Sequence, residues 1–188
     1  SLTLMGEGAT GSVLVLGCPG SCISDWPEGQ SADLEIKSLG FDAGGYWTSS
    51  CIALATFHGL RIEGCTFGGT ASQPALKLGR AQNYYRDPRG PAPSTDLRVT
   101  NCRFPRHRGA GAYEAVRLAA LDGGVLSGCE FDDFDCGAVL LHTYCFNVSI
   151  TDNVFRDAHP GAFDIVVENS GAMTSAQDMP SIVIARNR

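Results

Sequence analysis

The chain has 188 residues, of which 44 % are hydrophobic and 18 % charged, the composition of a globular protein that can bury a core. Acidic residues outnumber basic ones 20 to 14, and the net charge of −6 argues against a general affinity for nucleic acid or anionic membranes. No apolar run approaches the length needed to span a bilayer, so we expect no membrane span.

A nine-residue pattern of alternating apolar and polar residues, ending in Phe, recurs along the chain. Its copies are DLEIKSLGF (33–41), GLRIEGCTF (59–67), DLRVTNCRF (96–104), GGVLSGCEF (123–131) and NVSITDNVF (147–155), with a truncated copy, SIVIARNR, at 181–188. Alternation over four or five positions is strand periodicity, and the Gly, Asp, Asn and Pro clusters between copies mark turns.

A second short apolar segment lies between the copies. It reads CIAL (51–54), ALKL (75–78), AVRL (115–118), AVLL (138–141) and DIVV (164–167). Each repeat thus holds two or three short strands and no long helix, and each strand must be covered by the equivalent strand of the next repeat. The sequence predicts an all-β solenoid of about six coils, one domain over residues 1–188. Because the last copy stops before its aromatic residue, we expect the chain to be a fragment of a longer protein.

The repeat resembles the coil of right-handed parallel β-helices of the pectate-lyase-like superfamily, and the opening LTLMGEGATGSVLVLG is similar to the start of such helices. The resemblance implies a right-handed single-stranded parallel β-helix of the kind found in phage tailspikes, polysaccharide lyases and glycoside hydrolases. It implies a domain that binds carbohydrate or degrades polysaccharide, extracellular or virion-associated, with a polysaccharide or cell-surface glycan as partner. The alternative is a non-catalytic structural or receptor-binding β-helix, such as a homotrimeric tailspike shaft or a surface adhesin. No cofactor is expected, except Ca²⁺ if the protein is a lyase.

Three cysteines, Cys65, Cys102 and Cys129, occupy the same inward position of consecutive repeats, and Asn153 and Asn187 take that position later. We expect a buried ladder of reduced thiols continued by amides. Cys18 and Cys22, in the loop sequence CPGSC, are the better candidates for a disulfide bond.

The segments after the last three Phe residues of the pattern carry the candidate chemistry. If the turns keep register, one row contains Arg106, Asp133 and Asp157, and a second contains Arg108, Asp135 and His159. The acids and His159 are the candidate catalytic groups, because polysaccharide cleavage needs carboxyl groups on an outward surface, and the arginines would bind substrate. The competing interpretation is a set of turn-forming residues that face water.

Further candidates for substrate binding lie elsewhere. Aligning AVLLH with DIVVE places His142 beside Glu168, either as an acid–base pair or as a surface hydrogen bond. Tyr84 and Tyr85, in a polar, Pro-rich loop, either stack on sugar faces or pack on the loop itself. RFPRHR (103–108) matches a short lyase string, but the accompanying lyase motif is absent. Of the polygalacturonase motifs only the Asp132–Asp133 pair is present, so the sequence assigns neither activity.

Overall fold

The computed structural model describes residues 2–8, 11–15, 21–24, 30–42, 50–68, 73–79, 93–107, 114–168 and 181–188. Every regular element in these ranges is a β-strand. The strands are β1 (Leu2–Met5), β2 (Val13–Val15), β3 (Ile23–Ser24), β4 (Gln30–Ala32), β5 (Leu34–Lys37), β6 (Gly40–Asp42), β7 (Ile52–Leu54), β8 (Thr56–Glu63), β9 (Thr66–Gly68), β10 (Leu76–Leu78), β11 (Ser94–Thr100), β12 (Arg103–Phe104), β13 (Glu114–Ser127), β14 (Glu130–Asp132), β15 (Gly137–Thr151), β16 (Val154–Arg156), β17 (Phe163–Glu168) and β18 (Ile182–Ala185).

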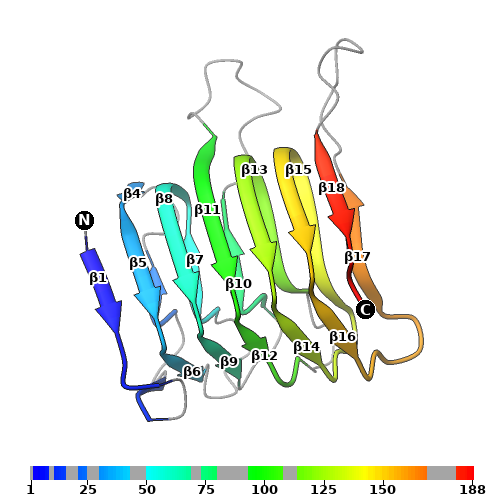
Figure 1. Cartoon of the computed structure of the whole chain (residues 1–188), viewed down its shortest axis with the longest axis horizontal. Helices are drawn as coiled ribbons and strands as arrows, with labels where there is room; N and C mark the ends of the chain where they lie inside the picture. The colour runs from blue at the N-terminus through cyan, green and yellow to red at the C-terminus, as the bar shows by residue number, and fades with distance from the viewer. Residues whose placement is uncertain are drawn as a thin grey trace.

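The strands stack in parallel from one end of the molecule to the other (Figure 1). A 12-stranded sheet runs along two sides of each coil, because the long strands β13 and β15 continue from one side to the next. A second sheet of six strands, in the order β16-β14-β12-β9-β6-β2, forms another side. The predicted parallel all-β solenoid is therefore confirmed. It has about four turns where about six coils were expected. The sequence count included the repeats at both ends, where apolar side chains of β1, β2 and β18 remain exposed and do not enclose a core.

A column of aromatic rings confirms the register of the repeat. Neighbouring rings of this column lie 4.6–5.1 Å apart between centroids and within 15° of parallel, in the order Phe41, Phe67, Phe104, Phe131 and Phe155. This spacing matches the separation of paired strands, so each ring stacks on the equivalent ring of the next coil. The alternating apolar residues of the strands, such as Ile62 and Val99, pair across coils and are fully buried.

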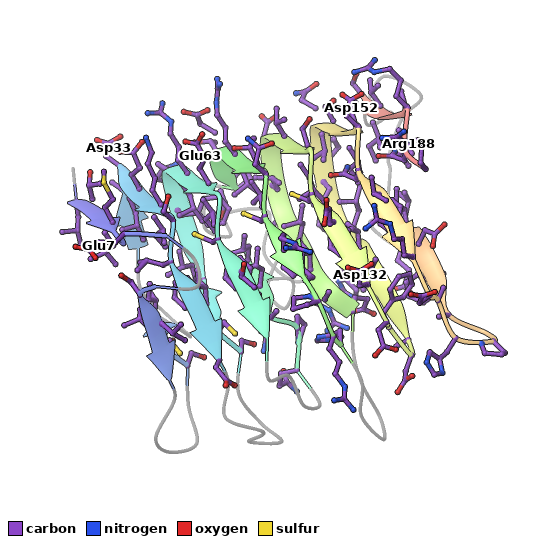
Figure 2. The ribbon with its side chains drawn as sticks, turned by 60° about the horizontal axis from the view of Figure 1, so that its bottom comes forward. Glu7, Asp33, Glu63, Asp132, Asp152 and Arg188 are labelled. Carbon is purple, nitrogen blue, oxygen red and sulfur yellow. The ribbon has the colours of Figure 1, made fainter. Side chains whose placement is uncertain are left out.

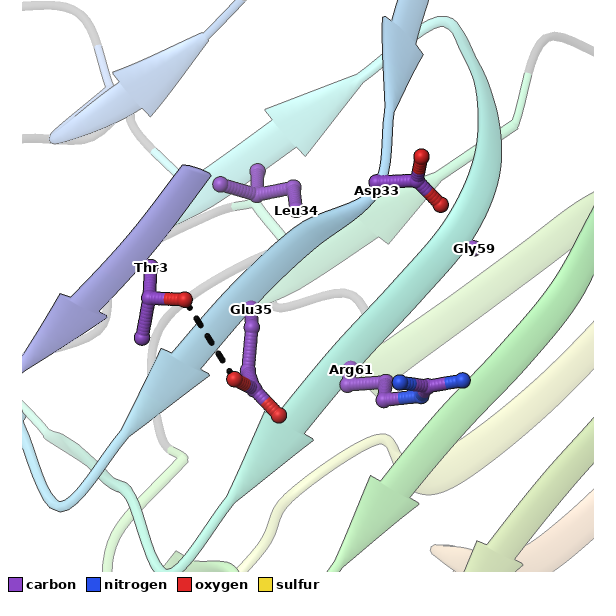
Figure 3. A pocket seen from close by; sticks show the side chains of 6 residues that line it. All are labelled: Thr3, Asp33, Leu34, Glu35, Gly59 and Arg61. Carbon is purple, nitrogen blue, oxygen red and sulfur yellow. Dashed lines mark hydrogen bonds between the residues drawn. The ribbon is translucent and has the colours of Figure 1, made fainter. Parts of the chain in front are cut away.

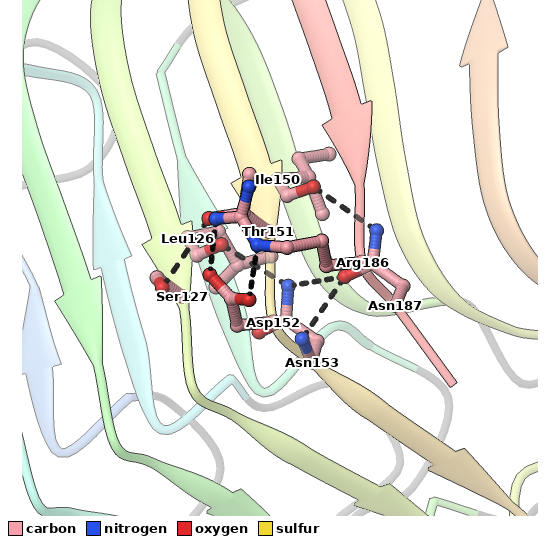
Figure 4. Close-up of polar contacts among 8 residues, drawn as sticks. All are labelled: Leu126, Ser127, Ile150, Thr151, Asp152, Asn153, Arg186 and Asn187. Atoms are coloured by element: carbon pink, nitrogen blue, oxygen red, sulfur yellow. Dashed lines mark hydrogen bonds and ion pairs between the residues drawn. The ribbon is translucent and has the colours of Figure 1, made fainter.

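The inward ladder of cysteines and asparagines also forms as predicted. The thiols of Cys65, Cys102 and Cys129 are fully buried, form no disulfide, and each approaches a carbonyl of the preceding coil at 3.7–3.8 Å. Asn153 continues the ladder by donating to the Leu126 carbonyl at 3.1 Å. Its side-chain oxygen accepts the Cys129 amide at 2.9 Å, so the Asn153 side chain joins two coils. Figure 4 shows its contacts with Leu126 and with Asn187.

The expected bond between Cys18 and Cys22 receives no support. Cys22 is a free thiol whose sulfur lies 3.9 Å from the Leu14 carbonyl oxygen, while Cys18 lies outside the described residues. Cys22 is half-buried and packs against the hydrophobic core at this end of the solenoid.

Two corners of the coil are built from residues with positive φ, stacked in register. The first row is Asp33, Gly59, Asp96, Gly123 and Asn147, and the second is Ser38, Gly64, Asn101, Gly128, Asp152 and Arg186. Glycine alternates with side-chain-bearing residues through most of both rows. A Cβ on Gly59 would lie 2.9 Å from Oδ1 of Asp33, and one on Gly128 would lie 2.6 Å from Oδ1 of Asn101. The side chain at one corner thus occupies space that glycine leaves open on the next coil.

Charged side chains cover the outside of the stack (Figure 2). Glu35 pairs in register with Arg61 and Lys37 with Glu63, and the Lys37 ammonium lies 3.6 Å from the Glu63 carboxylate. Such exposed pairs each contribute about 0–1 kcal/mol to stability, so they are part of a solvated surface.

Candidate functional site

The turns after Phe104, Phe131 and Phe155 keep the predicted register. Phe131 pairs with Phe155 and Asp132 with Arg156, which places Asp133 beside Asp157 on the next coil. The backbone amide of His107 donates to the Asp133 carbonyl at 3.1 Å, and that of His159 donates to the Phe134 carbonyl at 3.0 Å. Three consecutive turns therefore form one surface, which we call the turn site: Arg106, Asp133, Asp135, Asp157 and His159.

His159 is the centre of the turn site because its imidazole lies between two carboxylates. Nε2 is 3.3 Å from Oδ1 of Asp133, and Nδ1 is 3.3 Å from Oδ1 of Asp135. The side chains are about one-third exposed, so the ring and both carboxylates face solvent at the side of the stack. The sequence predicted the row that joins Asp135 to His159, but not the diagonal contact to Asp133.

The other two members of the turn site, Arg106 and Asp157, are more exposed. Asp133 and Asp157 both adopt positive φ, 58° and 52°, a conformation that Asp tolerates better than most residues. The Asp157 carboxylate has no hydrogen bond or ion pair with the other described residues. Arg106 is exposed on the neighbouring coil. The predicted partner Arg108 lies outside the described residues, as do Tyr84 and Tyr85.

A ladder of ion pairs runs beside the turn site on the outer face of β12, β14 and β16. The Arg103 side chain lies 3.2 Å from the Glu130 carboxylate. Arg156 lies 3.9 Å from the same carboxylate and 3.9 Å from that of Asp132. Arg103, the first residue of the lyase-like string, is thus held in a surface ion pair on a strand and does not project from a catalytic loop.

The predicted pair of His142 and Glu168 is adjacent in the structure. β15 and β17 pair them in register, and Nε2 of His142 lies 3.8 Å from the Glu168 carboxylate. At that distance the contact is an ion pair only when the imidazole is protonated, and no direct hydrogen bond joins the two groups.

One cluster of charged residues escaped the sequence analysis. Lys77 of β10 pairs in register with Arg117 of β13, so two cations lie on adjacent coils. Arg117 donates to the nearly buried Glu114 carboxylate through two nitrogens, at 2.8 and 3.1 Å. Burial, and secondarily the Arg117 charge, lowers the pKa of Lys77. The signal was present in the sequence, since ALKL and AVRL carry a cation at the same position.

Within the described ranges no group of three or more His, Cys, Asp or Glu residues is arranged to hold a metal ion. The same part of the chain contains no helix of sufficient length and hydrophobicity to cross a membrane. The turn site is therefore described by its own side chains: two carboxylates that contact one imidazole, with a further carboxylate and a guanidinium on adjacent coils.

No protein-family model matches the chain, and comparisons with curated proteins and with solved structures return no match either. The assignment to the parallel β-solenoids accordingly rests on the strand pairing, the aromatic column and the inward ladder described above.

Proposed function

We propose that this chain is a carbohydrate-binding parallel β-helix domain and that the turn site binds a cell-surface polysaccharide without cleaving it. The observation that supports the proposal is the position of His159 between Asp133 and Asp135. Carboxylates accept hydrogen bonds from sugar hydroxyl groups, and imidazole and guanidinium groups donate to hydroxyl and ring oxygens. Successive coils repeat such groups at about 4.8 Å, which suits an extended polymer better than a small molecule.

Binding fits this geometry better than hydrolysis. Hydrolases keep two carboxyl groups apart, with room between them for the sugar and, in inverting enzymes, for an attacking water. At the turn site the His159 ring occupies the space between Asp133 and Asp135. The two carboxylates are thus engaged by one side chain of the protein itself.

The repeat and the stacked Phe residues support kinship with the pectate-lyase-like superfamily, and with it an extracellular or virion-associated location. That kinship also supports the second candidate, a structural or receptor-binding shaft that forms a homotrimer. The observation that favours the second candidate is the Arg103–Glu130–Arg156 ladder, in which exposed ion pairs join three consecutive coils next to the turn site. Analytical ultracentrifugation, which measures the oligomeric state, together with the binding assay below distinguishes the two candidate functions. A stable trimer that binds no glycan supports the shaft.

Affinity electrophoresis against a panel of neutral and acidic polysaccharides tests the proposal. Asp135→Asn and His159→Gln should each weaken binding at least about tenfold, because each removes a charge-assisted contact. Asp122→Asn is the matched control: it removes the same charge at another corner, where the Asn147 amide donates to Asp122 at 2.7 Å.

The proposal fails if both turn-site variants bind every polysaccharide as the parent does while their folding is unchanged. Release of reducing ends or of unsaturated sugars by the parent would instead show that the site is catalytic.

A further inference from the structure

A small pocket opens on the outward face of β1, β5 and β8, on strands other than those that form the turn site (Figure 3). Its volume is about 170 Å³, and it is lined by Thr3, Asp33, Leu34, Glu35, Gly59 and Arg61. This is below the roughly 300–1,000 Å³ of pockets that hold drug-sized ligands, so the space suits a smaller molecule. We call it the Asp33 pocket.

Asp33 presents the uncompensated charge of the pocket. Its carboxylate makes no hydrogen bond or ion pair with other described residues. Oδ1 lies over Gly59, 2.9 Å from where a Cβ would be, so the absence of a side chain at Gly59 gives the carboxylate its place. The other carboxylate, that of Glu35, is already engaged: Lys37 lies 2.9 Å away and the Thr3 hydroxyl donates to it at 3.4 Å. The hydrogen bond from Lys37 lowers the pKa of Glu35.

Arg61 supplies the opposite charge. Its side chain is 54 % exposed, and its ion pair with Asp96 spans 3.9 Å, which is too long for a hydrogen bond. Arg61 is the register partner of Glu35, two residues beyond Gly59, so it lies on the diagonal from Asp33 at about 7–8 Å between backbones. Asp33 and Arg61 thus line one small space, and neither charged group makes a hydrogen bond to another described residue.

We propose that the Asp33 pocket binds a small zwitterion of the α-amino-acid type, with the ligand ammonium on Asp33 and its carboxylate on Arg61. A lone anion would pair with Arg61 but would face the carboxylates of Asp33 and Glu35. A lone cation would pair with Asp33 but would face Arg61. Only a ligand with both charges satisfies both sides, and a guanidinium can bind a carboxylate through two parallel hydrogen bonds. The exposure of the pocket makes the expected dissociation constant millimolar.

The test is an NMR titration of the whole ¹⁵N-labelled chain with glycine, with acetate and ethylamine as single-charge probes. Glycine should shift the amide signals of Glu35, Gly59 and Arg61 in a saturable way, and each single-charge probe should bind at least about tenfold more weakly. Asp33→Asn and Arg61→Gln should each weaken glycine binding by a similar factor. The first variant should keep the backbone intact, because Asn tolerates the φ of 50° found at this position.

Arg98→Gln is the matched control, because Arg98 occupies the same outward row one coil away and also pairs with Asp96, at 3.8 Å. It should leave glycine binding unchanged. The proposal is overturned if glycine causes no saturable shift, if acetate or ethylamine binds as tightly as glycine, or if Arg98→Gln weakens binding as much as Arg61→Gln does. None of these results depends on glycan binding at the turn site.

Discussion

Replacing Asn153 with Ala tests whether the inward ladder stabilises the stack. The Asn153 side chain is fully buried and satisfies two backbone groups, the Leu126 carbonyl at 3.1 Å and the Cys129 amide at 2.9 Å. It also donates to Asn187 on the next coil at 3.0 Å. A buried polar group left without its partner costs about 1–3 kcal/mol, so losing both backbone contacts should lower the free energy of unfolding by about 2–6 kcal/mol.

The measurement is urea denaturation followed by far-ultraviolet circular dichroism. Asn153→Cys places at this position the side chain that Cys129 has on the preceding coil, and it keeps a weak donor toward Leu126. The loss of unfolding free energy should therefore be smaller than in the Ala variant. Ser149→Ala, on the outward face of the preceding strand β15, should change the stability by no more than about 0.5 kcal/mol. A loss below about 1 kcal/mol for Asn153→Ala, or an equal loss in the Ser149 control, would refute the reasoning.

Three further predictions concern the core and one surface pair. Phe104→Ala opens a cavity in the aromatic column and should cost about 3–5 kcal/mol in urea denaturation, and a loss under about 1 kcal/mol would contradict the stacked register. Contacts with neighbouring thiols, together with burial, raise the pKa of Cys102. Iodoacetamide should therefore label Cys102 only after unfolding, measured by mass spectrometry, and rapid labelling of the native chain would contradict this expectation. The hydrogen bond from Arg186 lowers the pKa of Asp152 below its ordinary value of 3.8. The ion pair therefore stabilises the last coil fully at pH values above 3.8, and this stabilisation is lost as the pH falls through the lowered pKa of the folded state. The protection of the β18 amides, measured as the exchange rate relative to that of the unfolded chain at the same pH, should therefore fall in acid in the parent but not in Arg186→Gln. An equal fall in both would exclude this pair as the cause.

The fold could be predicted because one local rule is repeated. Alternation around Leu60 and Ile62, with a Phe at a fixed distance, specifies both the inward face and the partner strand, since the only surface that can cover such a strand is its own next copy. The ladder position of Cys65 followed from the same alignment. The number of turns did not, because a repeat at an end is present in the sequence whether or not it encloses a core.

The candidate site was predicted only as far as backbone register determines it. Alignment placed Asp135 beside His159 and His142 beside Glu168, and both neighbours are found. The diagonal contact of His159 with Asp133 depends on side-chain rotamers, which alternation does not encode. The Asp33 pocket depends on a missing side chain at Gly59, which a search for chemically active residue types passes over.

Because glycine alternates with larger residues at the corners, coils should be inserted or deleted in pairs, not singly. Each corner row has one close approach of a side chain to a glycine of the next coil, where the Asp33 side chain lies over Gly59 and the Asn101 side chain lies over Gly128. Deleting one coil from the middle would bring two side-chain-bearing corners together, or two glycines, whereas deleting two neighbouring coils would restore the original order. Up to the coil of Gly128, beyond which Asp152 and Arg186 end the alternation, lengthening or shortening this solenoid by design is therefore expected to succeed in steps of two coils.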